Sequence, residues 1–197
     1  MTADQPRGVL VAGVGNVFLG DDGFGVAVVR HLAGRELPEG VTVADYGIRG
    51  LHLAYDLLDG RFSTLILVDA VPVDAPPGTI VVLEIYPETE DGAEAETEYC
   101  VEPQPEDGAE AEAGPRFAGV PDAHGMDPQT VLDLLRTLGG LGPGRVERVC
   151  LVGVRPARLE EEMGLSEPVA SALERAAEAV FGLLGVATAA PVAHTYK

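Results

Sequence analysis

Three polar side chains have types and positions that suit a divalent metal. Asp22 follows a glycine-bounded apolar run, Asp69 ends the apolar segment TLILV, and His124 lies in DAHGMDP directly before a predicted helix. Two carboxylates that converge without a nearby Lys or Arg repel each other, so they need a proton, a metal or wide separation. Two carboxylates and an imidazole with open coordination positions suit nickel, zinc, iron or another divalent ion.

Each of these residues also has a simpler explanation. Asp22 can be a helix-start residue, because the helix dipole favours acid in the first turn. Asp69 can hydrogen-bond to its own backbone in a turn, and His124, which is followed by glycine, can be a surface histidine. Asp21 shares the first turn with Asp22. Helical spacing puts the two about 100° apart, so we expect only one of them to face a metal.

The elements that must position these residues are buried strands alternating with amphipathic helices. This alternation predicts a three-layer α/β/α domain with a mostly parallel sheet. The link VPVDAPPG is too short for a helical crossover, so we expect the strand after it to run antiparallel. Strands are predicted at 8–15, 41–45, 64–70, 78–85 and 146–154, and helices at 21–32, 49–60, 128–139 and 166–184.

In an open α/β sheet, ligands bind beyond the carboxyl ends of the strands. Gly15 ends the first predicted strand and Asn16 follows it, Asp45 ends the second, and Asp69 lies at the end of the third, one residue before its last. We therefore expect these residues at one edge of the sheet. A dinucleotide site is an alternative, since Asp45 lies about where a ribose-binding acid would. The fingerprint GxGxxG is broken, however, because Phe18 stands in place of its third glycine.

The charge of the chain is concentrated in one segment. The 197 residues carry a formal net charge of −19, and 11 of the 32 acidic residues fall between Glu88 and Glu112, where EDGAEAE occurs twice. High like charge and low hydrophobicity predict a disordered insertion at 88–114. It is either a tolerated surface insertion or a docking or solubilising segment. We expect a disordered N-terminus at 1–7, one domain at 8–186 and a flexible tail at 187–197.

The composition of the sequence argues against several classes of binding partner and against a membrane-spanning or secreted protein. The negative charge argues against nucleic acid and anionic membranes, which require clustered Lys and Arg. The start of the chain has no apolar signal-peptide core, and no apolar stretch approaches the roughly 20 residues that span a bilayer. Cys100 and Cys150 form no CxxC pair. These features predict a cytoplasmic protein.

Four motifs occur in order and at suitable intervals: GVGNVFLGDDGFG at 13–25, VDAVPVDAPPGT at 68–79, DAHGMDP at 122–128 and LVGVRPARLEEEMGLS at 151–166. Together they resemble the hydrogenase maturation proteases, which remove a C-terminal extension from the large subunit of [NiFe] hydrogenases. The resemblance runs from about residue 8 to 184, apart from the acidic insertion, which has no counterpart in the family pattern.

The resemblance implies a role for each of the three polar residues. The nickel-binding acids of the family fall on Asp22 and Asp69, and its histidine falls on His124. The nickel is carried by the hydrogenase large-subunit precursor and serves as the recognition signal. The implied fold is a phosphorylase/hydrolase-like α/β/α sandwich with a five-stranded mixed sheet and one antiparallel strand, and the implied state is a monomer.

A further motif is matched less regularly. Asp45-Tyr46-Gly47 stands where relatives often have Asp-Gly-Gly, and Tyr46 departs from that pattern. We therefore give this segment only a role in substrate contact. The residues assigned to substrate contact are Gly15, Asn16, Asp45 and Gly47.

Two mechanisms fit the implied nickel contact. The metal can polarise the scissile carbonyl or lower the pKa of a water molecule. Alternatively Asp22 or Asp69 can act as the general base, and we assign both as catalytic. A covalent mechanism lacks a nucleophile, because no Ser–His–Asp, Cys–His or HExxH arrangement has usable spacing and Cys150 is expected to be buried. The alternative function is a non-catalytic nickel-site sensor or chaperone of hydrogenase assembly.

Overall fold

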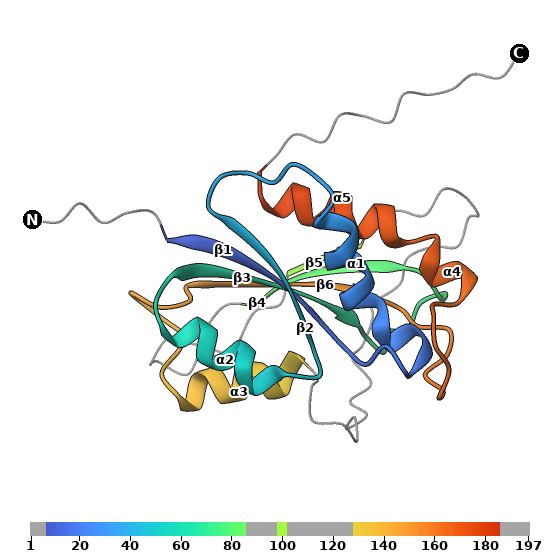
Figure 1. The fold of residues 1–197 in the computed structure, drawn as a ribbon, viewed down its shortest axis with the longest axis horizontal. Coiled ribbons are helices and arrows are strands. Elements are labelled where there is room, and N and C mark those ends of the chain that lie inside the picture. The colour runs from blue at the N-terminus through green and yellow to red at the C-terminus, as the bar shows by residue number, and fades with distance from the viewer. Residues whose placement is uncertain (1–6, 86–97, 102–127, 186–197) are drawn as a thin grey trace, which may run out of the picture.

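The computed structural model describes residues 7–85, 98–101 and 128–185 of the chain. One sheet with the strand order β2-β1-β3-β6-β4-β5 runs through its centre (Figure 1). The strands are β1 (Gly8–Val14), β2 (Val41–Gly47), β3 (Phe62–Ala70), β4 (Ile80–Ile85), β5 (Glu98–Val101) and β6 (Arg148–Val154).

The directions of the strands follow the predicted pattern. β2, β1, β3 and β6 are parallel to one another, and β4 pairs with β6 in the antiparallel direction. The reversal at β4 agrees with the short link before it, which has no room for a helical crossover. All five predicted strands are present, and the expected mixed sheet is confirmed.

The sixth strand was not predicted. β5 lies inside the acidic segment 88–114, which we expected to be disordered throughout, and it pairs antiparallel with β4. β5 has the sequence Glu-Tyr-Cys-Val, which includes the β-favouring residues Tyr99 and Val101. An open sheet edge offers unpaired backbone groups to such a segment. The rest of the predicted insertion lies outside the described residues.

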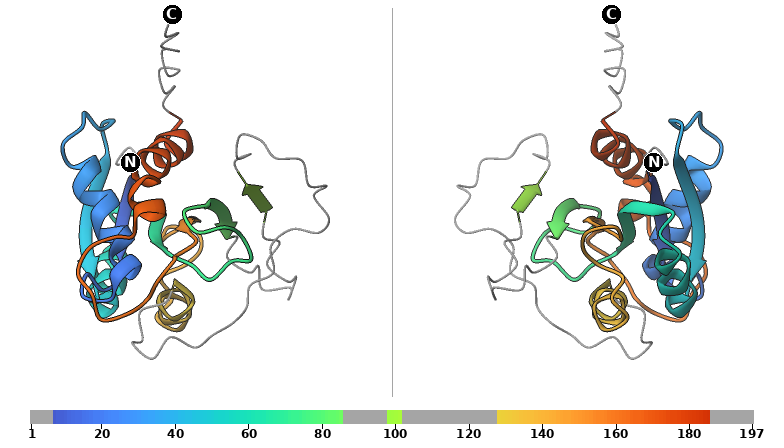
Figure 2. Two further views of the ribbon diagram at one scale, coloured as in Figure 1. Left: turned by 90° about the vertical axis from the view of Figure 1, so that its right-hand side faces the viewer. Right: turned by 90° about the vertical axis from the view of Figure 1, so that its left-hand side faces the viewer.

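Helices cover both faces of the sheet, so the domain has three layers. α1 (Phe24–Leu32), α4 (Glu167–Ala170) and α5 (Leu173–Leu183) lie on one face, and α2 (Gly50–Leu58) and α3 (Pro128–Thr137) lie on the other (Figure 1). Figure 2 shows α5 and α3 on opposite sides of the sheet. Strand residues alternate between the two cores: Leu65 and Leu67 face α2 and α3, whereas Ile66 and Val68 face α1 and α5.

The prediction of one long C-terminal helix from Ser166 to about Leu184 is wrong in one respect. The structure divides this segment into two helices, α4 and α5. At the division the Ala172 N–H bonds to Val169, three residues back, which is the tighter 3₁₀ pattern. The apolar spacing is nevertheless correct, because Val169, Ala176 and Val180 are buried against the sheet. Periodicity thus identified the buried face but not the tightened turn.

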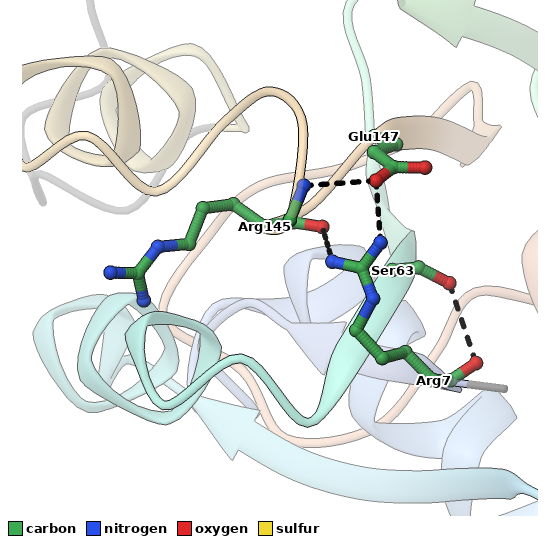
Figure 3. A network of polar contacts seen from close by, with 5 residues as sticks. Arg7, Ser63, Arg145 and Glu147 are labelled. Carbon is green, nitrogen blue, oxygen red and sulfur yellow. Dashed lines mark hydrogen bonds and ion pairs between the residues drawn. The ribbon is translucent and has the colours of Figure 1, made fainter. Parts of the chain in front are cut away.

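At the amino ends of the strands, a polar network fixes the entry to β1 (Figure 3). The Arg7 guanidinium donates to the Arg145 carbonyl at 2.9 Å and pairs with the Glu147 carboxylate at 2.5 Å. The Ser63 hydroxyl donates to the Arg7 carbonyl. Arg7, which we expected to be part of a disordered segment at 1–7, is therefore ordered, whereas 1–6 and 186–197 lie outside the described residues. Within the described residues, no helix has the length and apolar character needed to cross a bilayer.

Two glycines allow α1 to approach the carboxyl ends of β1 and β3. A Cβ at Gly25 would lie 2.0 Å from the Val68 carbonyl oxygen and 2.4 Å from that of Val14. A Cβ at Gly13 would lie 2.3 Å from the Gly25 carbonyl oxygen. Both contacts are with backbone atoms, which cannot rotate away as a flexible side chain would. The helix therefore begins directly against the ends of two strands.

We expect Gly25→Ala to destabilise the protein by about 3 kcal/mol, because the new methyl group overpacks against fixed backbone. Denaturant unfolding measures the change. Gly182→Ala in α5 is the matched control, since nothing lies within 4 Å of the position that its new methyl group would take, and we expect it to be neutral or to stabilise by about 0.5–1 kcal/mol. Equal effects of the two substitutions would contradict the close approach of α1.

Candidate active site

The carboxyl ends of the four parallel strands meet at one edge of the sheet, which is where α/β domains place ligand sites. Asp69 lies there, one residue before the end of β3, and pairs in register with Gly153 of β6. Asp69 is 5% exposed, and its Oδ1 accepts a hydrogen bond from the Ala70 N–H at 2.8 Å. The strand thus holds the Asp69 carboxylate at the predicted edge.

Gly15 lies between the two predicted acids. A Cβ on Gly15 would lie 1.9 Å from the Asp22 carbonyl oxygen and 3.4 Å from the Asp69 carboxylate oxygen Oδ1. Gly15 also has a φ of +114°, which side-chain-bearing residues rarely adopt. Gly15 therefore borders both the main-chain carbonyl of Asp22 and the carboxylate of Asp69.

A short loop and a 3₁₀ turn present Asp22. The Asn16 N–H donates to Asp22 Oδ2 at 2.6 Å, and Asn16 Oδ1 accepts a hydrogen bond from the Phe18 N–H at 3.0 Å. Asp22 lies in η1 (Gly20–Gly23), which directly precedes α1, and is partly exposed. Asn16 therefore shapes the loop that holds the Asp22 carboxylate.

Asp21 has a different environment from its neighbour. It is 0% exposed, and its carboxylate accepts hydrogen bonds from the N–H groups of Ala157 and Arg158, and from the N–H and hydroxyl of Ser166. Burial alone would raise the pKa of Asp21, but the hydrogen bonds from Ser166, Arg158 and Ala157 hold it below its ordinary value. The Asp21 side chain is thus fixed in the interior of the protein. Asp22, its neighbour in the chain, is the residue that borders Gly15.

Asp45 and Gly47 end β2 beside the same loop. The Gly15 N–H donates to the Gly47 carbonyl at 3.0 Å, so the backbone of Gly47 borders the site. The Asp45 carboxylate instead pairs with Arg30 of α1 at 3.0 Å, and its carbonyl accepts a hydrogen bond from the Arg49 guanidinium. Gly47 therefore lies against the predicted site, whereas the Asp45 side chain is engaged by the first helix.

Tyr46, the departure from the motif, is a core residue. Its ring is buried among apolar side chains, and its hydroxyl donates to Asp56 Oδ2 of α2 at 2.8 Å. Burial, followed by the hydrogen bond and the negative charge of Asp56, raises the pKa of Tyr46 well above its ordinary value. Tyr46 therefore links β2 to α2 behind the site.

The third predicted metal ligand, His124, lies outside the described residues. In the part of the chain that the structure describes, no three His, Cys, Asp or Glu side chains are grouped so that they could hold a metal. Asp22 and Asp69 can supply carboxylate oxygens, so a set of three ligands needs a residue outside the part of the chain that the structure describes, such as His124. Cys150 is buried in mid-strand, and burial raises the pKa of its thiol to about 11, which agrees with its predicted role in packing.

Comparisons with known proteins agree with this architecture. A family model described as hydrogenase maturation protease matches residues 26–86. The hydrogenase 2 maturation protease of Escherichia coli is 30% identical over 178 residues, which cover 89% of this chain and 90% of that protein. A putative hydrogenase maturation protease of Methanocaldococcus jannaschii is 38% identical over 81 residues, which cover 41% of this chain and only 53% of that protein.

A solved structure gives the same result. The hydrogenase maturating endopeptidase HybD from E. coli superimposes with a TM-score of 0.64 at 29% identity, covering 91% of this chain and 93% of that one. Fold and sequence together define the class as maturation peptidases with an α/β/α fold. The chain belongs to the hydrogenase maturation protease family.

We expect Tyr46→Phe to cost about 0.5–1.5 kcal/mol at neutral pH, because one hydrogen bond to Asp56 is lost. It should also flatten the decline of stability at alkaline pH. In the unfolded chain a tyrosine ionises near pH 10, whereas the raised pKa keeps Tyr46 protonated in the folded protein. The contribution of the Tyr46 hydroxyl to the free energy of unfolding is therefore complete below about pH 10, and it is lost as the pH rises towards the folded-state pKa.

Denaturant unfolding between about pH 8 and 11 measures both effects. Tyr55→Phe is the control, because Tyr55 lies on α2 with 59% of its surface exposed. An alkaline decline in Tyr46→Phe as steep as in the wild-type protein would contradict the assignment.

Proposed function

We propose that the chain is an endopeptidase that removes the C-terminal extension of a [NiFe] hydrogenase large-subunit precursor after nickel insertion. The observation that carries the proposal is the placement of Asp22 and Asp69 around Gly15, at the carboxyl edge of the sheet, in a member of this family. Nickel is part of the substrate in this proposal, and it serves as the signal that the precursor is ready.

Electrostatics supports the use of nickel as a signal. Carboxylates that lie close together repel, and a cation placed between them removes that cost. A precursor that carries nickel would bring this cation to Asp22 and Asp69, with His124 as the third proposed ligand. A precursor without nickel would bring neutral peptide to the same carboxylates. The site would therefore bind the nickel-loaded precursor more tightly than the nickel-free precursor.

Cleavage would follow from that contact in one of two ways. Nickel bound in the precursor can polarise the scissile carbonyl or lower the pKa of a water molecule. Alternatively, Asp22 or Asp69 can remove a proton from the attacking water as a general base, which contributes roughly 10²–10⁴-fold. The buried Cys150 thiol is unsuited to a covalent route.

The remaining assignments concern the path of the substrate. We propose that the precursor lies along the loop at Gly15 and Asn16 and beside Gly47, which is joined to Gly15 by a backbone hydrogen bond. The Asp45 carboxylate is paired with Arg30. We therefore propose that Asp45 contacts the substrate only at the edge of this path. A cytoplasmic location stays a prediction from the composition of the sequence, and a monomeric state stays a prediction from the family resemblance.

Purified protein incubated with nickel-loaded precursor should shorten the precursor by one C-terminal peptide, and nickel-free precursor should keep its mass. Mass spectrometry of the intact precursor measures this directly. Binding of loaded precursor without any change in mass would support the alternative, a non-catalytic sensor or chaperone. Equal cleavage of both forms would contradict the role of nickel as the signal.

We expect Asp22→Ala and Asp69→Ala each to reduce processing of loaded precursor by at least about 100-fold, because each removes a metal contact or the general base. His124→Ala should act in the same direction. Asp74→Ala is the matched control, since Asp74 is an exposed carboxylate five residues after Asp69 in the β3–β4 link, and it should process at the wild-type rate. Initial rates at fixed precursor concentration, with thermal melting to verify folding, decide the outcome. Wild-type rates in all three variants would refute the assignment.

A further inference from the structure

The Asp21 carboxylate joins two segments that are far apart in sequence. Its Oδ2 accepts hydrogen bonds from the Ala157 N–H at 2.8 Å and the Arg158 N–H at 3.0 Å. Ser166 contributes its N–H to Oδ1 at 2.6 Å and its hydroxyl to Oδ2 at 2.9 Å. One buried side chain thus connects η1 to both ends of the segment 157–166, which follows β6.

Backbone contacts extend the same junction. The Gly20 N–H donates to the Glu162 carbonyl at 2.7 Å, and the Asp21 N–H donates to the Arg158 carbonyl at 3.2 Å. The loop before α1 and the segment after β6 lie side by side at the right of Figure 1. The position of η1 therefore depends on a long-range contact as well as on β1 and α1.

The donors around Asp21 require a carboxylate. Four donor groups point at its two oxygens, and only an acceptor without N–H groups can serve all of them. An asparagine would place an NH₂ group against some of these donors. Ser166 also occupies the N-cap position of α4 without making a side-chain capping bond, because its hydroxyl is directed to Asp21.

The next residue in the chain is Asp22, and it projects in another direction. Successive residues of a 3₁₀ helix differ by about 120°, so Asp21 faces the interior while the Asp22 carboxylate accepts a hydrogen bond from the Asn16 N–H. The main-chain carbonyl of Asp22 borders Gly15. Asp69 belongs to β3 and is fixed by the sheet. A displacement of η1 would therefore move Asp22 relative to Asp69.

We propose that Asp21 is a positioning residue for the cleavage reaction: by fixing η1 against the segment 157–166, it holds the Asp22 carboxylate in place beside Asp69. This inference rests on the proposed cleavage of the precursor and adds a residue that does not itself touch the substrate. The relevant parameter is turnover, because an error of about 1 Å in the position of a reacting group can cost about 100-fold in rate.

The test is the kinetics of Asp21→Asn on nickel-loaded precursor. We expect kcat to fall roughly 10–100-fold while KM stays within about twofold of the wild-type value. The control Asp59→Asn makes the same chemical change at an exposed carboxylate and should leave both parameters unchanged. An unchanged kcat in folded Asp21→Asn would overturn the proposal.

A double variant separates positioning from general damage to the fold. If Asp21 acts through Asp22, Asp21→Asn should cause less than about twofold further loss in the Asp22→Asn background. A purely structural role would reduce the active fraction by the same factor in both backgrounds, and that result would overturn the proposal.

If Asp21→Asn does not fold, Ser166→Ala carries the test, because it removes one of the four hydrogen bonds and retains the carboxylate. We then expect a several-fold loss of kcat at unchanged KM, whereas a wild-type kcat would overturn the proposal. Failure of the proposed function gives a different result. In that case the wild-type protein itself leaves the mass of loaded precursor unchanged.

Discussion

The rest of the site depends on the close approach of the chain at residues 13–25 to the ends of β1 and β3. Backbone atoms occupy the space where a Cβ would lie at Gly13, Gly15 and Gly25. This contact lets α1 begin directly at the edge of the sheet, and it places the turn before α1 beside the end of β3. Asp22 and Asp69 are 47 residues apart in the chain, so their proximity depends on this close approach.

Two adjacent aspartates in that turn have different roles because their surroundings differ. Asp21 is buried, and four donors compensate the cost of removing its charge from water. Asp22 is partly exposed and lies beside Gly15 and Asn16. One carboxylate therefore stabilises the junction of two loops, and the other lies at the edge of the sheet where we propose that the substrate binds.

Much of the fold could be predicted from the sequence, because buried strands and amphipathic helices have distinct periodicities. The strand β3, which carries Asp69, and the reversal at β4 followed from an apolar run and a short link. β5 could not be found in this way, since its pairing depends on the open edge of β4 and its neighbours in sequence are highly charged. The division between α4 and α5 was also missed, because one apolar stripe runs through both.

The sequence by itself determined the layered sheet and predicted that Asp22 and Asp69 lie at one edge of it, since the carboxyl ends of parallel strands share one edge. Only the tertiary structure decided which member of the pair Asp21–Asp22 faces that edge. Helical spacing separates the two side chains, but it contains no information about which side is the interior. That choice depends on Ala157, Arg158 and Ser166, whose donor groups reach Asp21 only after β6 has joined the sheet.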